Sequence, residues 1–315
     1  MQGEQKKEQQ ILVLKGWEGL ADRLQSLSHC MNYCIKFNAA ICVDWRDYMW
    51  GQGKRNFSDY FQIVGIPVVS LETVLKRIEE GAKVNPPAYT LSHLEAPPAE
   101  IIHFSEFASK IDNNCLKQEG DIIVHNSKGT RMWHLSNLIQ NLRIAEEIRP
   151  SIISKLSRLY LPYTSIHLRG TDRKTDSTLK FVFDNYDQLP PHAKARSYII
   201  SDMRSLTEEW LALHPESHII DETAPVLKIP PGKQGTHMLL EEVLEFYGIT
   251  KHELNINTIT DFLVIAFASW GVGHGESTFT RLATFLRQGG AIGISKWLDW
   301  MPSRSRFEIF TLQAP

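Results

Sequence analysis

The chain has 315 residues, a length that suits two α/β domains better than one hydrophobic core. Hydrophobic residues make up 43% and charged residues 22%, as in ordinary globular proteins, and the formal net charge is −2. This charge excludes a strongly basic surface, so we expect no nucleic-acid partner, and any anion site has to be built locally.

The ends and the cysteines give little sign of membranes or metals. No stretch approaches the roughly 20 apolar residues of a membrane helix, and the polar N-terminus lacks the apolar core of a signal peptide. The sequence therefore predicts a cytoplasmic protein without a membrane span. The four cysteines lack the clustering of a zinc site, which favours free buried thiols at Cys30, Cys34, Cys42 and Cys115.

The first half of the chain predicts a βαβ unit with a parallel strand pair. Its parts are an apolar strand at 11–14, a turn at 16–19, an amphipathic helix at 20–37 and a second strand at 39–43. Further along we expect a strand at 67–69, a helix at 71–80, a loop over the four prolines of 85–98, a strand at 121–124, and helical structure over 137–160 broken at Pro150.

The second half predicts another α/β unit, with a domain boundary that divides the chain into residues 1–155 and 156–315. Strands are expected at 164–168, 197–201, 218–220 and 291–295. Helices are expected at 206–213, 236–247, 259–269 and from about Ser277, where a glycine-rich turn that starts at Gly273 leads into the helix. Polar residues follow several strands, and ligands bind at that end of open parallel sheets. They are Asp44, Arg169 and Asp202.

The segment from His167 to Lys174 carries three basic side chains after an apolar strand. The guanidinium of Arg169 can grip a phosphate bidentately, and a carboxylate such as Asp172 can orient it, with Arg173 beside it. The alternative is a solvated charge run at a strand end. Asp202 follows the next strand and could accept hydrogen bonds from a base or ribose, or simply cap the next helix.

Two glycine-rich turns are further candidates. The turn before Ser277 and Thr278 opens a helix, where free N–H groups and the helix dipole favour an anion; the alternative is a plain N-cap at Ser277. Gly16 and Gly19 lack the spacing of a dinucleotide fingerprint. We interpret them as a tight turn facing an interdomain cleft, with a purely structural turn as the alternative.

Taken together, these segments resemble the fucosyltransferase superfamily, closest to its α1,6-fucosyltransferase branch with bacterial nodulation and animal core enzymes. The resemblance is carried, in family order, by GWEGLADRLQSLSHCMNYCIKFNAAICVDWRDY, IHLRGTDR, YIISDMRSLTEEW and ITDFLVIAFASWGVGHGESTFTRLA. It implies a GT-B-like α/β fold of two Rossmann-like domains facing across a cleft. The GDP-sugar would bind the C-terminal domain and the carbohydrate acceptor the N-terminal one.

Residue by residue, the resemblance implies Arg169 as the diphosphate ligand, Asp202 as a nucleoside contact and Ser277 as a phosphate contact. The remaining donor-side matches are His167, Asp172, Arg173, Asp261 and Thr278, and the acceptor-side residues are Gly16, Gly19, Asp44, Trp45 and Arg46. The chain departs from the family at Gly170, where a second arginine is frequent, and at Met203, where a second acid is frequent. Ser177, with Asp176 beside it, stands where animal core enzymes carry a glutamate.

The implied activity is inverting transfer of a sugar, L-fucose from GDP-fucose, to a glycan hydroxyl. No metal is expected, because Arg169 and the helix terminus at Ser277 can neutralise the departing diphosphate. A carboxylate would take the hydroxyl proton, with Asp176, Glu18 and Asp44 as candidates in that order. The alternatives are a same-fold transferase using another nucleotide sugar, a catalytically silent glycan- or nucleotide-binding protein and, less favoured, an NAD-binding oxidoreductase.

Overall fold

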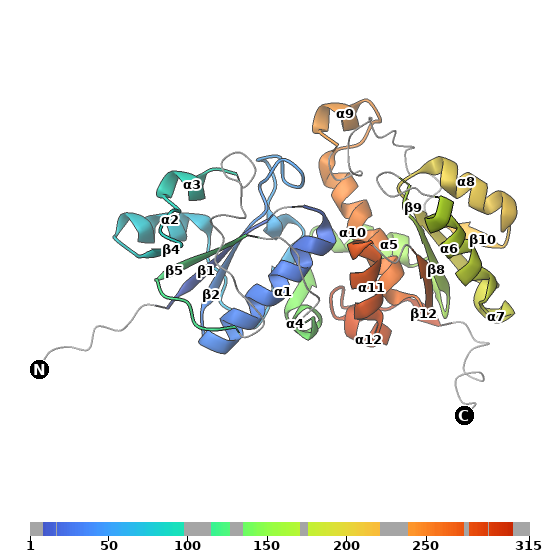
Figure 1. The fold of residues 1–315 in the computed structure, drawn as a ribbon, viewed down its shortest axis with the longest axis horizontal. Helices are drawn as coiled ribbons and strands as arrows, with labels where there is room; N and C mark the ends of the chain where they lie inside the picture. Colours follow the sequence, from blue (N-terminus) through green and yellow to red (C-terminus); the bar gives the residue numbers. More distant parts are fainter. Residues whose placement is uncertain are drawn as a thin grey trace, which may run out of the picture. The chain divides into compact units, whose positions relative to one another are not determined.

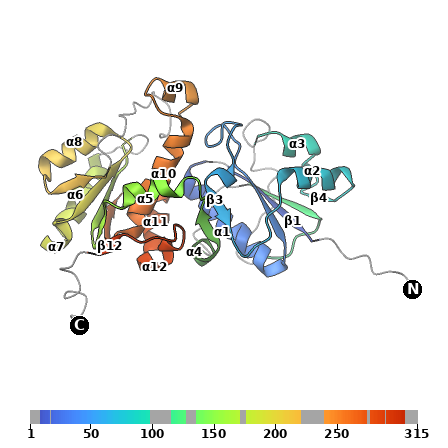
Figure 2. The same cartoon turned by 180° about the vertical axis from the view of Figure 1, so that it is seen from behind.

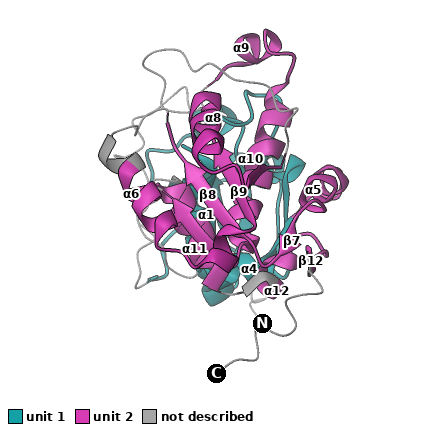
Figure 3. Ribbon diagram, turned by 90° about the vertical axis from the view of Figure 1, so that its right-hand side faces the viewer, with its two compact units in different colours: residues 1–143 teal, residues 144–315 magenta. Residues whose placement is uncertain are grey.

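The computed structural model describes residues 9–16, 18–97, 115–126, 135–170, 176–220, 239–273, 277–288 and 290–304. The chain forms two compact units, residues 1–143 and 144–315 (Figure 3). This boundary lies before the expected one at 155/156, because helix α5 (Arg149–Leu156) packs against α10 (Lys251–Phe267) of the second unit. Lys155 Nζ donates to Asn257 Oδ1 at 2.5 Å between these two helices.

Unit 1 contains the first six strands and the first four α-helices. Its strands are β1 (Ile11–Lys15), β2 (Ala40–Asp44), β3 (Phe61–Ile63), β4 (Val84–Asn85), β5 (Ile122–Asn126) and β6 (Leu142–Ile144), which runs over the boundary. Its helices are α1 (Leu20–Phe37), α2 (Leu71–Glu79), α3 (Leu91–Glu95) and α4 (Ser136–Asn141), with a 3-10 turn η1 (Phe57–Asp59).

Unit 2 holds the remaining elements. Its strands are β7 (Tyr160–Leu161), β8 (Thr164–Leu168), β9 (Ser197–Ser201), β10 (Ser217–Ile219), β11 (Trp270–Gly273) and β12 (Ser303–Arg304). Besides α5 and α10, its helices are α6 (Asp176–Asp187), α7 (Pro191–Lys194), α8 (Arg204–Leu213), α9 (Glu241–Glu245), α11 (Thr278–Gln288) and α12 (Gly290–Ser295).

The sheet of unit 1 is parallel, in the order β2-β1-β5-β4, and has helices on both faces (Figures 1 and 2). Side chains alternate between faces along each strand. Ile11 and Val13 pack with Val74 of α2 and Leu94 of α3. The opposite face is covered by α1, which also packs against α4. This burial on both faces explains why β1 and β2 consist of continuous apolar runs.

The sheet of unit 2 repeats this plan in the parallel order β10-β9-β8-β11. On one face, Ile166 and Leu168 of β8 pack with Val182 of α6 and with Leu206 and Trp210 of α8. On the other face lie α10 and α11, which pack against each other. Two small sheets, β3-β6 and β7-β12, complete the fold.

Most of the expected strands are confirmed. Those at 11–14, 39–43, 121–124, 164–168, 197–201 and 218–220 are present within two residues, and the helix at 20–37 has the expected bounds. The segment at 67–69 contributes only an isolated bridge between Ile41 and Val68. The region 85–98 is not a simple loop, because it contains the end of β4 and all of α3. Pro150 lies in the first turn of α5 instead of breaking a longer helix.

The last third of the chain differs most from expectation. Residues 270–273 form β11, where no strand was expected, and residues 291–295 belong to α12, not to a strand. Gly271 and Gly273 carry no strand signal but suit close packing, because a Cβ at these positions would lie 2.3 Å from the Arg287 guanidinium and 2.8 Å from Thr280 Cγ2. With β11 completing the sheet beside β8, residues 290–295 pack as a helix against α10 and α11.

Helix α10 begins at Lys251, eight residues before the expected start at 259, because Thr250 and Glu253 form a capping box. α9 (Glu241–Glu245) is shorter than the expected 236–247, of which residues 236–238 lie outside the described part.

The four cysteines are free thiols, and all are buried in unit 1, as expected. Burial raises the pKa of the Cys34 thiol to about 12, and it raises the pKa of the Cys42 thiol to the same value. Thiols in this state are not nucleophilic at neutral pH, so they contribute packing and not chemistry.

Candidate functional site

The expected donor residues follow neighbouring strands of unit 2. Leu168, the last residue of β8, pairs with Ser201, the last residue of β9, so the chain leaves both strands at the same height. Arg169 and Asp202 are the next residues, and both are partly buried. The Asp202 carboxylate Oδ1 accepts the Gly170 N–H at 2.7 Å, which ties the two strand exits together.

The third part of this edge comes from β11 and α11. β11 pairs with β8 on the side away from β9, with Gly273 opposite His167. After residues 274–276, which lie outside the described part, Ser277 precedes α11 and Thr278 is its first residue. Ser277 is fully buried, and its Oγ lies 3.5 Å from the N–H of Thr280, in the position of an N-cap. Ser277 therefore caps α11, whose N-terminus follows the same edge of the sheet.

His167 has a different place from the one expected for a donor ligand. Its side chain is only 7% exposed, and its Nδ1 lies 2.6 Å from the Thr280 Oγ1. Its ring centroid is 5.6 Å from that of Phe279. His167 thus connects β8 to the first turns of α11, and its ring is engaged by that helix.

The other expected site residues of unit 2 are Asp172, Arg173, Asp176 and Asp261. Asp172 and Arg173 lie outside the described residues. Asp176 is the first residue of α6, which places this candidate base six residues after Gly170, the described end of the Arg169 loop. Asp261 lies within α10 and is partly buried.

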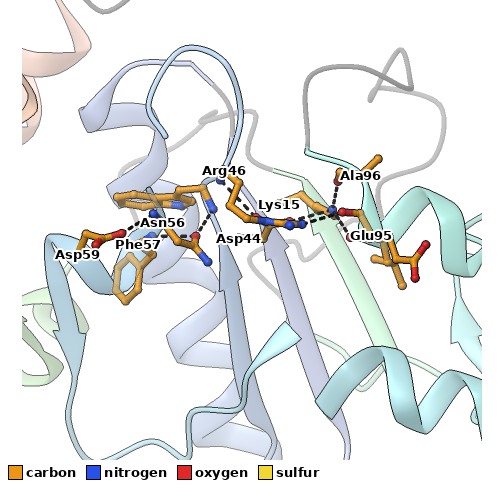
Figure 4. A network of polar contacts seen from close by, with 10 residues as sticks. Lys15, Asp44, Arg46, Asn56, Phe57, Asp59, Glu95 and Ala96 are labelled. Carbon is orange, nitrogen blue, oxygen red and sulfur yellow. Dashed lines mark hydrogen bonds and ion pairs between the residues drawn. The ribbon is translucent and has the colours of Figure 1, made fainter. Parts of the chain in front are cut away.

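In unit 1, a buried network of charges forms at the ends of β1 and β2 (Figure 4). Lys15 and Asp44 are opposite each other in the parallel register, and Lys15 Nζ donates to Asp44 Oδ2 at 2.9 Å. The same ammonium donates to the carbonyls of Leu94 and Ala96, at 2.8 and 2.9 Å. Because these carbonyls lie at the end of α3, the network fastens that helix to the sheet.

Arg46 completes the network from the loop after β2. Its Nε and Nη2 donate to the two oxygens of Asp44, at 2.8 and 3.1 Å, and Nη2 also donates to the Glu95 carbonyl. Burial alone would raise the pKa of Asp44, but the hydrogen bonds from Arg46 and the charge of Lys15 hold that pKa below its usual range. Burial lowers the pKa of Lys15, against the opposing effect of Asp44.

This environment argues against Asp44 as the catalytic base. A general base works best with a pKa near the operating pH, whereas the surroundings of Asp44 favour its charged form. Both carboxylate oxygens are committed to Lys15 and Arg46. Of these two expected acceptor-side residues, Asp44 is fully buried and Arg46 keeps 27% of its side chain exposed.

Trp45 and Gly16 belong to the interior of unit 1, which corrects their expected place on an acceptor surface. Trp45 is fully buried, with its ring centroid 5.0 Å from that of Phe57 and 5.8 Å from that of Trp50. Gly16 is glycine for a packing reason: a Cβ there would lie 2.1 Å from Trp45 Cδ1 and 2.5 Å from Arg23 Nη1. The structural interpretation of this turn explains the glycine better than ligand binding does.

Glu18 and Gly19 remain as partly exposed members of the turn before α1. Glu18 has a left-handed backbone with φ of 67°, and its carbonyl accepts the Arg23 Nε at 2.8 Å. Gly19 is the residue before α1 and has no contact closer than 4.0 Å for an added Cβ. The turn is thus held by its backbone, and the Glu18 side chain stays a candidate.

Sequence reasoning missed the buried charged residues of unit 1. Besides Lys15, the fully buried Arg23 donates to Asp47 Oδ1 at 2.8 Å. The available signal was a lysine closing the apolar run of β1, in register with an aspartate closing the run of β2. Arg23, within the amphipathic α1, carried no comparable signal.

Comparison with solved structures shows a likeness in fold to fucosyltransferases. The chain is similar to the fucosyltransferase NodZ from Bradyrhizobium, with a TM-score of 0.60 and 17% identity over 89% of this chain and 94% of that chain. It is similar to NodZ alpha-1,6-fucosyltransferase soaked with GDP-fucose, with a TM-score of 0.58 and 16% identity over 89% and 93%. POFUT1 in complex with GDP-fucose gives a TM-score of 0.50 and 10% identity over 94% and 97%.

The likeness confirms the expected fold class, α/β with parallel sheets, and this fold resembles that of the fucosyltransferases. No family model and no curated protein sequence matches the chain. In the described ranges, no cluster of three or more His, Cys, Asp or Glu side chains could hold a metal ion. None of the described helices has the length and apolar character needed to cross a membrane.

The buried network of unit 1 gives a stability prediction. Asp44→Ala leaves the Lys15 ammonium buried without its counterion, so we expect the free energy of unfolding to fall by about 3–5 kcal/mol in urea denaturation. Glu80→Ala is the matched control, because its contact with Lys76 is 3.9 Å long and exposed, and a change within about 0.5 kcal/mol is expected.

The same network sets the direction of the pH dependence. Because the folded pKa of Asp44 is lowered, its contribution is present above the ordinary carboxyl pKa of about 4 and is lost as pH falls through the lower folded value. Asp44→Asn should therefore cost least at the lowest pH. An equal loss of stability for Asp44→Ala and Glu80→Ala would contradict the importance of the network.

Proposed function

We propose that this chain is an inverting glycosyltransferase that moves L-fucose from GDP-fucose to a glycan hydroxyl. The observation that carries the proposal is the convergence of Arg169, Asp202 and the start of α11 on one edge of the parallel sheet of unit 2. Its support is the fold shared with fucosyltransferases, two of which were solved with GDP-fucose. In our proposal unit 2 binds the donor and unit 1 contributes to the acceptor site.

The chemistry required of the donor site is neutralisation of the departing diphosphate. A guanidinium binds phosphate oxygens bidentately, and the N–H groups at the start of α11 add partial positive charge. Donors fixed before the reaction stabilise the developing charge without reorganisation. Arg169, beside a peptide held by Asp202, meets this requirement through its place at the end of β8.

Transfer in our proposal is a direct displacement by the acceptor hydroxyl, with inversion at the sugar carbon. Asp176 is the preferred base, since it begins α6 in the donor-binding unit, and Glu18 is the second candidate. The arrangement of two nucleotide-binding folds facing across a cleft, typical of GT-B enzymes, and a cytoplasmic location stay predictions. A transferase of this fold using another nucleotide sugar remains the nearest rival.

A catalytically silent binding protein is the second candidate, and it rests on Gly170 and Met203. These two uncharged residues stand at positions where charges are frequent in the family, and they pack together. A Cβ at position 170 would lie 2.4 Å from Met203 Sδ. Turnover of GDP-fucose separates an enzyme from a silent protein, since both could bind GDP.

The first prediction of the proposal concerns Arg169. Arg169→Ala should abolish most turnover and weaken GDP binding roughly ten- to hundredfold, the value of a charge-assisted contact of about 1.5–3 kcal/mol. Arg169→Lys should restore little, because an ammonium lacks the planar fork. Isothermal titration with GDP measures the effect, and near-normal affinity in folded Arg169→Ala would rule out the phosphate contact.

A second prediction concerns metals. Since Arg169 and the start of α11 supply the positive charge, activity should persist in excess EDTA. The assay compares fucose transfer with and without chelator, followed by addition of Mg²⁺ or Mn²⁺. Loss of activity in EDTA, restored by either ion, would show that a metal carries the charge assigned to Arg169.

A third prediction concerns the donor and the stereochemistry. GDP should raise the melting temperature and UDP should not, because a ligand that binds only the folded state stabilises it by about 2.7 kcal/mol at a hundredfold excess over Kd. With GDP-β-L-fucose as donor, direct displacement gives an α-linked product, identified by proton NMR. Selective stabilisation by UDP or NAD, or a β-linked product, would refute the assignment.

A further inference from the structure

We propose that Asp202 is a positioning residue that sets the direction of Arg169 by holding the Arg169–Gly170 peptide group. This inference rests on the proposed function, in which Arg169 binds the donor diphosphate. It differs from the role that the family resemblance implies for Asp202, which is a contact to the nucleoside. The observation behind it is the 2.7 Å hydrogen bond from the Gly170 N–H to Asp202 Oδ1.

The hydrogen bond acts on Arg169 through the geometry of the peptide. The Gly170 N–H belongs to the planar group that joins residues 169 and 170, so fixing this N–H fixes ψ of Arg169. The acceptor is a carboxylate, and such charge-assisted bonds are roughly twice as strong as neutral ones. One oxygen of Asp202 is thereby committed to the backbone of the neighbouring strand exit.

Asp202 itself sits in a turn that is fixed on both sides. Ser201 Oγ lies 3.1 Å from both the N–H and the carbonyl of Met203, so these flanking residues are held to each other around Asp202. The Met203 carbonyl also accepts the Thr207 N–H at 3.3 Å in the first turn of α8. The carboxylate therefore extends from a hydrogen-bonded turn between β9 and α8.

The packing around Gly170 closes the other side of the same peptide. Gly170 is buried, and a Cβ at this position would lie 2.4 Å from Met203 Sδ and 2.6 Å from Leu206 Cδ1. Met203 and Leu206 thus fill the space beside Gly170, while Asp202 holds its N–H. The uncharged residues at 170 and 203 are consistent with one function, which is to seat the peptide that carries Arg169.

The test compares Asp202→Asn with Asp202→Ala. An asparagine keeps a carbonyl oxygen for the Gly170 N–H, whereas alanine removes the acceptor. We expect GDP affinity within about threefold of wild type for Asp202→Asn and weakened by about tenfold for Asp202→Ala. In Asp202→Ala the donor KM should rise and kcat should fall, while the acceptor KM stays unchanged. Asp187→Ala is the control, because it removes a carboxylate that is 69% exposed at the end of α6.

A second measurement follows the hydrogen bond without any donor. In protein labelled with 15N-glycine, exchange of the Gly170 amide should accelerate at least about tenfold in Asp202→Ala and stay near wild type in Asp202→Asn and Asp187→Ala. If Asp202 acts on the nucleoside instead, Asp202→Asn would lose as much GDP affinity as Asp202→Ala. Unchanged Gly170 exchange in Asp202→Ala, or that equal loss of affinity, would overturn the proposal. Failure of wild-type protein to bind GDP would refute the proposed function separately, because the exchange comparison still reports on the bond to Gly170.

Discussion

The parallel pairing of β8 with β9 and β11 is the constraint on which the candidate donor site depends. Parallel strands end on the same side of a sheet, so residues far apart in sequence leave it together. Leu168 is level with Ser201, and His167 is level with Gly273. The exits that follow carry Arg169, Asp202 and the start of α11. The site is thus assembled by backbone register before any side chain contributes.

Two polar contacts then hold the residues that follow these strands in place. Asp202 joins the exits of β9 and β8 through the Gly170 N–H, and His167 joins β8 to α11 through Thr280. Arg169 lies between these two connections in the sequence. Neither contact needs a ligand, so the chain on both sides of Arg169 is held in the absence of a donor. In a site that is already ordered, the entropic cost of ligand binding is smaller, because less conformational freedom is lost when the ligand binds.

Unit 1 uses its strand ends differently. At the positions where unit 2 presents Arg169 and Asp202, unit 1 has a closed network of Lys15, Asp44 and Arg46, with α3 carbonyls as further acceptors. Lys15 and Arg46 share the single carboxylate of Asp44, so no second carboxylate within the network can pair with them if Asp44 is removed. The same edge of a parallel sheet thereby provides stability in one unit and a candidate binding site in the other.

The sequence predicted strands where apolar runs end in a polar residue, which located Arg169, Asp202 and Asp44 correctly. The sequence did not predict β11. Gly271 and Gly273 lie against Arg287 and Thr280 of α11, where a larger residue would not fit, and glycine gives no strand signal. The sequence also misplaced Trp45, since burial among other rings depends on the loop that folds back over it. Side-chain partners such as Lys15 and Asp44, 29 residues apart, follow from strand register, which composition and periodicity leave undetermined.

The distribution of cysteines has a practical consequence for measuring the stability of each unit. All four lie in unit 1, all are buried, and unit 2 has none. An alkylating reagent reacts with thiolates that reach solvent, so labelling under native conditions requires opening of unit 1. The chain therefore carries four internal reporters of one unit alone. Their labelling rates separate the unfolding of unit 1 from that of unit 2 without an engineered probe.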